Sequence, residues 1–181
     1  MEIVTKTPTE VLGDDLSSKL EEIVFKQLKA TDPNIFLTSR IRAANWELFA
    51  ELLGKMSTTR FMRVGDEFIA ELEKHTGQAP REQEANVQLI IRGMRYLHIQ
   101  MYPLDLLEEC AEFLISLSKF FGLSQNLKIK IEYAEVLSQI LLPVAGTATA
   151  ELNYPTWAKA MEGLYQKAQE LASKPKLWIH G

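Results

Sequence analysis

Apolar residues recur at intervals of three and four along almost the whole chain, and this spacing constrains the fold more than any other feature. It is clearest between Ile129 and Leu141, where apolar side chains stand at positions 129, 133, 136, 137, 140 and 141. A stripe with a period of about 3.6 residues is typical of a helix that buries one face. Residues 127–131 also alternate as a short strand would, but the helical stripe continues through them. We therefore interpret them as the first turns of a helix and predict an all-α protein.

Proline, glycine and short polar stretches divide these stripes into about seven helices. The tetrapeptide Thr7-Pro8-Thr9-Glu10 has the form of a capping box that would begin the first helix. The segment that follows places Leu16, Leu20, Ile23, Gln27 and Leu28 at helical spacing, up to about Ala30. An irregular connector then follows Asp32-Pro33-Asn34 as far as Arg40. Six further helices are predicted at about 43–56, 58–75, 82–100, 104–121, 127–143 and 155–171, with Thr58 as the cap of the second of them.

The spacing of these helices predicts a repeat. Alternate helices begin near positions 43, 85 and 127, two steps of 42 residues, within the period of about 40–47 residues of HEAT or armadillo units. The helix at 104–121 is apolar on two stripes, as a helix between neighbours in stacked hairpins must be. We predict HEAT/armadillo-like helical-hairpin repeats, with a closed bundle of seven helices as the alternative.

We expect three parts in the chain. Residues 1–40 form an N-terminal helix and connector, residues 41–174 a block of three hairpins, and residues 175–181 a tail. The consecutive apolar residues Leu177, Trp178 and Ile179 indicate a truncated repeat array, unless the tail folds back onto its own core.

Composition excludes several classes of function. A net charge of −4 gives no basic field for nucleic acid. Cys110 is the only cysteine, which indicates a reducing compartment. No apolar run approaches the ~20 residues that span a bilayer, and the N-terminus lacks the features of a secretory signal. We predict a cytoplasmic protein with no membrane insertion.

The motifs of enzyme chemistry are absent. The histidines His75, His98 and His180 belong to no metal-binding spacing, and no phosphate-binding or nucleophile-elbow glycine motif occurs. Gly65 and Gly93, inside predicted helices, are expected to allow close helix–helix approach. We predict a protein that is not an enzyme and has no cofactor, metal site or catalytic residue.

Charge patterning gives the only functional lead. Four carboxylates at i, i+3, i+4 and i+7 form an acidic ridge on one predicted helix. The candidate partner-binding residues are this ridge and three nearby side chains: Asp105, Glu108, Glu109, Glu112, Arg92, Arg95 and Tyr102. The ridge is either a solvated face or a docking strip for a basic partner segment. The arginines either pair with the ridge or, beside tyrosine, contact a partner.

Several segments resemble one protein family. The segment from Ile90 to Leu114, above all Ile91-Arg92-Gly93-Met94-Arg95-Tyr96 and Met101-Tyr102-Pro103, resembles the N-terminal conserved region of the Furry family of cell-morphogenesis proteins. Residues 43–72 are similar to its fungal members, and residues 136–145 and 153–165 to two of its later helices. The resemblance covers about residues 35–170.

The resemblance implies a fragment of a very large protein built from HEAT/armadillo-like repeats. Members of this family act as scaffolds for NDR/LATS-type kinases and their Mob coactivators in polarised growth and cell separation. It implies such a kinase and Mob as partners, a location at sites of polarised growth, and no catalytic residue. The alternative is a structural spacer or cap of the array that contacts no partner directly.

Overall fold

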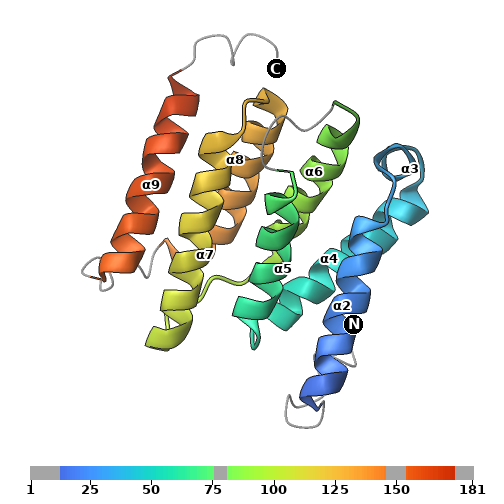
Figure 1. Ribbon diagram of the computed structural model, residues 1–181, viewed down its shortest axis with the longest axis horizontal. Helices are drawn as coiled ribbons and strands as arrows, with labels where there is room; N and C mark the ends of the chain where they lie inside the picture. Colours follow the sequence, from blue (N-terminus) through green and yellow to red (C-terminus); the bar gives the residue numbers. More distant parts are fainter. Residues whose placement is uncertain (1–12, 76–80, 146–153, 174–181) are drawn as a thin grey trace.

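The computed structural model describes residues 13–75, 81–145 and 154–173, and all regular structure in these residues is helical. With the labels of Figure 1, the helices are α2 (Asp14–Lys29), α3 (Pro33–Thr38), α4 (Arg40–Ser57), α5 (Phe61–Glu73), α6 (Arg81–Gly93), α7 (Leu104–Leu123), α8 (Leu127–Leu141) and α9 (Pro155–Ala172), with 3₁₀ turns η1 (Met94–Tyr96) and η2 (Leu142–Val144). The prediction of an all-α protein is confirmed.

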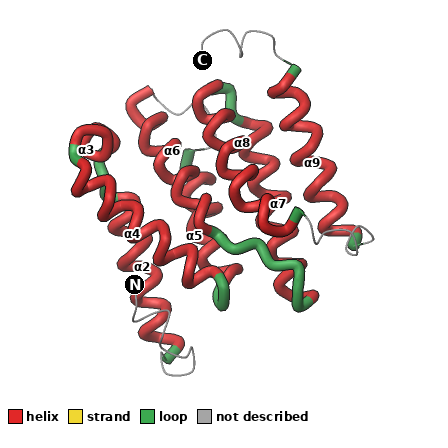
Figure 2. Tube along the Cα trace, turned by 180° about the vertical axis from the view of Figure 1, so that it is seen from behind, coloured by secondary structure: helices red, strands yellow, loops and turns green. Residues whose placement is uncertain are grey.

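The helices stack in two layers, which Figures 1 and 2 show from opposite sides. Helices α5, α7 and α9 lie side by side in one layer, and α4, α6 and α8 form the other. Successive long helices therefore alternate between layers, which is the helical-hairpin arrangement that the sequence predicts. Helix α2 packs against α4 and α6, and its Phe25 meets Phe68 of α5 edge to face at 5.0 Å. The helices α4, α6 and α8 begin 41 and 46 residues apart, close to the predicted step.

Short polar side chains and prolines begin several helices. The carboxylate of Asp32 accepts a hydrogen bond from the Asn34 amide, and Pro33 occupies the first position of α3. The Asn126 side chain accepts from two amides of the first turn of α8, those of Lys128 and Ile129. Such caps satisfy donors that have no partner within the helix. The segment 127–131 is helical, so the strand reading is excluded.

Helix α7 is buried on both sides, as predicted. Leu107, Ala111 and Leu114 are buried on one stripe, and Phe113, Leu117 and Phe120 on the other. It contacts α5 on one side and α9 on the other. Because no single hairpin can bury both stripes, the stacked arrangement follows from the sequence of this helix.

Three glycines permit close packing. A Cβ on Gly65 would lie 3.2 Å from the Phe113 ring, and one on Gly93 would lie 3.3 Å from Leu28 and Phe68, so the predicted role of both is confirmed. Gly54 on α4 was not predicted and is the tightest: a Cβ there would lie 2.3 Å from the backbone oxygen of Tyr96. The backbone of η1 therefore rests directly on α4.

Two predicted helix boundaries are wrong. The connector before Arg40 contains the short helix α3. The helix predicted at 82–100 ends at Gly93, and after η1 the chain is extended, with Leu97 and Ile99 buried. This extended segment is held by hydrogen bonds from the His98 amide to Ser57 Oγ (3.1 Å) and from the Gln100 amide to Cys110 Sγ (3.3 Å).

Two further details of the first helices are wrong. Thr58 is not the cap of α5; it lies at the end of α4, where its hydroxyl donates to the Lys55 carbonyl oxygen. The residues that the sequence places at helical spacing on α2 do not all lie on its buried face, because Leu16, Ile23 and Gln27 are exposed. The buried face of α2 contains Ser17, Glu21, Val24, Phe25 and Leu28. The Glu21 carboxylate can lie on this face because Arg60 and Arg63, at the start of α5, pair with it. The predicted capping box and the apolar tail lie outside the described residues.

Candidate partner-binding surface

The arginines of the candidate set are engaged in internal ion pairs. Arg92 at the end of α6 donates from Nε and Nη2 to the two carboxylate oxygens of Glu132 on α8, at 2.7 and 2.8 Å. Glu132 is buried, whereas the Arg92 side chain is one-third exposed. A planar guanidinium matched to a carboxylate in this way is the strongest form of protein ion pair. The hydrogen bonds to Glu132 raise the pKa of Arg92 although burial opposes the charge.

Arg95 belongs to a second cluster, between η1 and α4. Its Nη2 donates to both carboxylate oxygens of Glu47 on α4, at 2.6 and 2.5 Å, and to the hydroxyl oxygen of Tyr96 at 2.9 Å. The Tyr96 hydroxyl donates in turn to Glu47. Burial, and then this hydrogen bond to Glu47, raise the pKa of Tyr96. The cluster fixes the turn that follows α6 onto the surface of α4.

The prediction that these arginines pair with the acidic ridge is therefore wrong, because their partners are other carboxylates. They do pair within the chain, but with Glu132 and Glu47, which lie on α8 and α4 rather than on α7. Neither acid stands out in the sequence, because each is flanked by large hydrophobic or aromatic residues: Trp46 and Leu48 beside Glu47, and Ile131 and Tyr133 beside Glu132. The two pairs join residues 40 and 48 positions apart, on elements that become neighbours only when the hairpins stack, so sequence spacing alone does not identify them.

The acidic ridge lies on α7. Asp105, Glu108 and Glu112 are exposed and Glu109 is half-buried. Within residues 13–75, 81–145 and 154–173, none of the four forms an ion pair. From the described part of the chain, one side-chain hydrogen bond reaches the ridge, from the Tyr154 hydroxyl to Glu108 at 2.7 Å. That bond, and the negative charge around it, raise the pKa of Tyr154.

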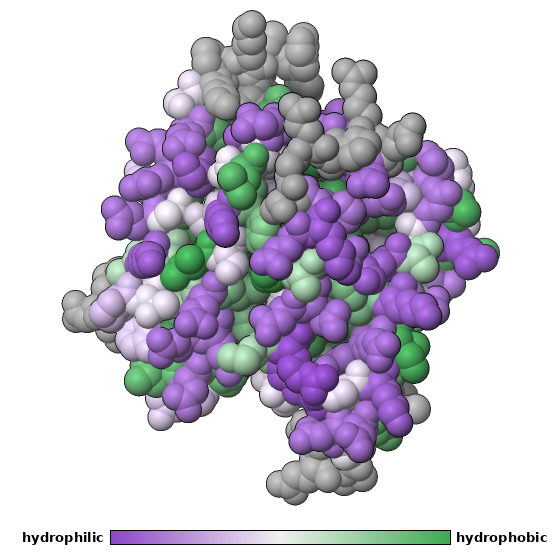
Figure 3. Space-filling view, in the orientation of Figure 1, coloured by the Kyte–Doolittle hydropathy of each residue, from purple (hydrophilic) through white to green (hydrophobic). Residues whose placement is uncertain are grey.

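A groove runs between α5 and α7 beside this ridge. It encloses about 260 Å³ and is lined by residues of both helices: Phe61, Met62, Gly65, Asp66, Ile69, Glu109, Glu112, Phe113 and Ser116. Two ridge carboxylates thus form one wall, and Asp66 on α5 stands on the other. Figure 3 shows that hydrophilic side chains cover most of the molecular face in the orientation of Figure 1, with isolated hydrophobic side chains between them.

Tyr102 is a strongly exposed candidate residue. Its side chain is 85% exposed, in the extended segment that leads into α7, and the peptide bond to Pro103 is cis. No hydrogen bond holds its hydroxyl among the described residues. The structure therefore places Tyr102 and the ridge on the surface but places Arg92 and Arg95 in internal contacts.

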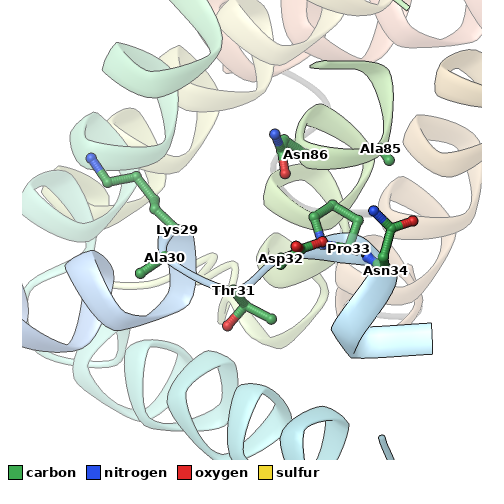
Figure 4. A pocket seen from close by; sticks show the side chains of 8 residues that line it. All are labelled: Lys29, Ala30, Thr31, Asp32, Pro33, Asn34, Ala85 and Asn86. Carbon is green, nitrogen blue, oxygen red and sulfur yellow. Dashed lines mark hydrogen bonds between the residues drawn. The ribbon is translucent and has the colours of Figure 1, made fainter. Parts of the chain in front are cut away.

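Other recesses lie between neighbouring helices and at their turns, and those at the α2–α3 turn, between α7 and α9, and between α2 and α6 each contain lysine. One recess of about 590 Å³ lies between the α2–α3 turn and the first half of α6 (Figure 4). It is lined by Asp32, Asn34 and Asn86 together with Lys29, whose Nζ donates to Glu71 at 3.0 Å. In the described part of the chain, no three His, Cys, Asp or Glu side chains gather as a metal site would require, and no helix combines the length and apolarity needed to cross a bilayer.

Comparison with known proteins gives the family. A model described as "Cell morphogenesis N-terminal" matches residues 1–181, which is the whole chain. The chain belongs to this cell-morphogenesis family. It is 52% identical over 168 residues to "Cell morphogenesis protein PAG1" of Saccharomyces cerevisiae, and the match covers 93% of the chain and 7% of that relative. It is 39% identical over 179 residues to "Cell polarity protein mor2" of Schizosaccharomyces pombe, covering 98% of the chain and 8% of the relative.

The resemblance to the Furry cell-morphogenesis family is thus confirmed. No solved structure matches the chain. The segment that carried the resemblance most specifically, Ile91 to Tyr96, is the segment that contains both internal arginine clusters. In this member of the cell-morphogenesis family, that motif ties α6 and η1 to α4 and α8.

Proposed function

We propose that the chain is a non-catalytic scaffold segment of a large cell-morphogenesis protein, which supports NDR/LATS-type kinase–Mob signalling in polarised growth and cell separation. The proposal draws on the family, whose members in two yeasts are named for cell morphogenesis and cell polarity. It includes a location at sites of polarised growth. A scaffold of this kind acts by raising the effective concentration of its partners, not by chemistry of its own.

The observation that carries the proposal is the unpaired acidic ridge of α7. Four neighbouring carboxylates on one helix repel one another, and none of the four forms an ion pair with a described lysine, arginine or histidine. The arginines of the same region are bound elsewhere in the chain. A surface of one charge, left without counter-charge, suits a basic partner and accelerates its encounter.

The test is a pull-down of the purified kinase–Mob complex on the immobilised chain. We expect the wild-type chain to retain the complex at micromolar concentration, and the double variant Glu108→Lys/Glu109→Lys to lose it. The matched control is Glu22→Lys on α2, an exposed carboxylate distant from the ridge in sequence. Circular dichroism confirms that each variant remains folded.

The alternative is a spacer or cap of the repeat array. Its support is the pairing of Arg92 and Arg95 with acids on neighbouring helices, which makes these residues structural. Binding that persists unchanged in the folded charge-reversal variant favours a contact elsewhere on the chain. No retention at micromolar concentration favours the spacer and moves the contact to another part of the parent protein.

A further inference from the structure

The groove between α5 and α7 combines an apolar floor with acidic walls, whereas the recesses at the α2–α3 turn, between α7 and α9, and between α2 and α6 each contain lysine. Its floor is rigid. The rings of Phe61 and Phe113 meet edge to face at 5.4 Å, and both side chains are buried. Gly65 opens the space above them, because a side chain there would be in contact with Phe113.

The apolar surface of the groove is accessible at its edge. Met62 is half exposed, at 50%, and lies on the side of α5 that faces the groove together with the partly buried Ile69. The unbranched thioether side chain of Met62 can adapt to different occupants. The groove therefore offers contact area to a side chain with an aliphatic stem.

The walls of the groove carry negative charge only. Asp66 stands on α5, and Glu109 and Glu112 on α7. None of these three carboxylates forms an ion pair or a hydrogen bond with a described side chain, whereas Glu21, Glu47, Glu71 and Glu132 all pair with lysine or arginine. The two arginines at the start of α5 do not line the groove, because Arg60 and Arg63 both pair with Glu21 on α2.

We propose that this groove docks a basic helical segment of a protein partner, with an arginine or lysine whose stem crosses Met62 and Ile69 and whose charged group lies between Asp66 and the α7 carboxylates. This deepens the proposed scaffold function by naming the partner's chemistry, and rests on it. Arg and Lys side chains commonly lay an apolar stem on apolar surface and extend the charge beyond it. The charges of the two walls are complementary to such a group.

The size of the groove favours a macromolecular occupant. Its volume of about 260 Å³ is below the roughly 300–1,000 Å³ typical of small-molecule sites. The groove also runs between two side-by-side helices, beside an exposed ridge that continues to Asp105 along α7. A partner helix with further basic residues at i+3 and i+4 would meet the ridge while one side chain fills the groove.

The probe is a synthetic helix-forming peptide with leucine and arginine at i, i+3 and i+4, compared with a matched peptide in which glutamine replaces every arginine. Fluorescence anisotropy measures the affinity of each for the 181-residue chain. We expect the arginine peptide to bind, and its binding to weaken when ionic strength rises from about 0.01 M to about 0.15 M, because the screening length falls from ~30 Å to ~8 Å. The glutamine peptide should bind at least about tenfold more weakly, since it loses several charge pairs.

Variants of the chain locate the site. Asp66→Asn and Glu112→Gln should each weaken the arginine peptide about twofold to fivefold, and Met62→Ala should weaken both peptides. The control Glu22→Gln removes one exposed carboxylate from α2 and should change nothing. Thermal melts followed by circular dichroism verify that the variants fold.

Three results would overturn the proposal: no binding of the arginine peptide, equal binding of the glutamine peptide, or equal effects of Asp66→Asn and Glu22→Gln. These outcomes are separable from failure of the scaffold function. If the kinase–Mob complex is retained but the arginine peptide is not bound, the groove is wrong and the scaffold stands. If the peptide binds but the complex is not retained, the groove stands with another basic partner.

Discussion

The guanidinium of Arg92 and the carboxylate of Glu132 form a two-point contact, at 2.7 and 2.8 Å, between α6 and α8. These helices are successive members of one layer, so the pair joins one hairpin to the next. The carboxylate is buried and the guanidinium is partly exposed. The contact therefore serves the packing of the array, although arginine beside tyrosine in the sequence suggested a partner surface.

Replacing Arg92 with alanine should destabilise the chain by about 2–4 kcal/mol, because it leaves the buried Glu132 carboxylate without its counter-charge. Urea denaturation gives the free energy of unfolding. The variant Arg92→Lys should recover only part of the loss, since an ammonium cannot make the two parallel hydrogen bonds. The control Arg42→Ala, at an exposed position on α4, should change stability by less than about 0.5 kcal/mol. An equal effect of the two alanine variants would contradict a structural role for the pair.

Neutralising the ridge should leave the fold intact or stabilise it slightly. Glu109 and Glu112 are three residues apart on α7, and like charges at this spacing cost a few tenths of a kcal/mol. We expect the double variant Glu109→Gln/Glu112→Gln to unfold at an equal or slightly higher temperature than the wild type. A loss of more than about 1 kcal/mol would mean that the ridge is part of the packing, and the case for a docking surface would fall with it.

Gly54 should be the least replaceable of the described glycines. A Cβ at this position would meet the backbone of Tyr96 at 2.3 Å, and backbone cannot move aside as a flexible side chain can. We expect Gly54→Ala to cost more than about 2 kcal/mol by forcing η1 away from α4. The matched control is Gly13→Ala, where an added Cβ meets nothing within 4 Å. Calorimetric melting of both variants makes the comparison, and similar melting temperatures would contradict it.

The fold could be predicted from the sequence where one apolar stripe dominates. Helix α8, with Tyr133 and Val136 on one face, leaves no alternative to a helix with that face buried. The doubly apolar α7 similarly requires a neighbour on each side. The prediction was less successful where burial does not follow hydrophobicity: α2 buries Glu21 in place of Ile23. The burial of Glu21 depends on two arginines at the start of α5, about 40 residues away in the sequence. Sequence spacing alone does not show that these residues pair.

The end of α6 shows the same limit. Leu97 and Ile99 fit a continued helix about as well as an extended segment, and tertiary contacts decide between them. The extended form is stabilised by Ser57 and Cys110, which accept hydrogen bonds from the backbone of this segment. For the candidate surface, sequence spacing placed the four ridge carboxylates on one helix correctly. It could not show that Asp66 stands opposite them on α5, because that requires the packing of the two helices.

The contributions of Glu71 and Glu21 to the stability of the chain should change with pH in opposite directions. Burial alone would raise the pKa of Glu71, but hydrogen bonds from Lys74 and Lys29 outweigh it and lower the pKa below 4.5. Glu71 therefore contributes stability above pH 4.5 that is lost as the pH falls through its folded-state pKa. Burial raises the pKa of Glu21, although Arg60 and Arg63 oppose the shift. Its contribution is present below pH 4.5 and is lost as the pH rises through its folded-state pKa.

Urea denaturation between about pH 3 and about pH 7 separates the two residues, because the slope of stability against pH reports protons bound on unfolding. Compared with the wild type, Glu71→Gln should lose less stability as the pH falls through this range. Glu21→Gln should lose more, because it lacks the residue whose contribution grows in acid. Slopes that change in the same direction in both variants would contradict the opposite shifts.

Cys110 should be inert in the folded chain. Its side chain is fully buried on α7, and burial raises the pKa of the thiol to about 11 despite a hydrogen bond from the Gln100 amide. The thiolate is the reactive form of cysteine. Raising the pKa of Cys110 from 9.0 to about 11 lowers the thiolate population about 100-fold at neutral pH. Reaction with a chromogenic disulfide should therefore be at least that much slower in buffer than in urea, where the helices are unfolded. The variant Leu107→Ala, which opens a cavity in the same buried stripe, should accelerate the reaction in buffer. Fast reaction of the wild-type chain in buffer would mean that α7 is not covered by both of its neighbours in solution, and the two-layer stacking would then be wrong at its centre.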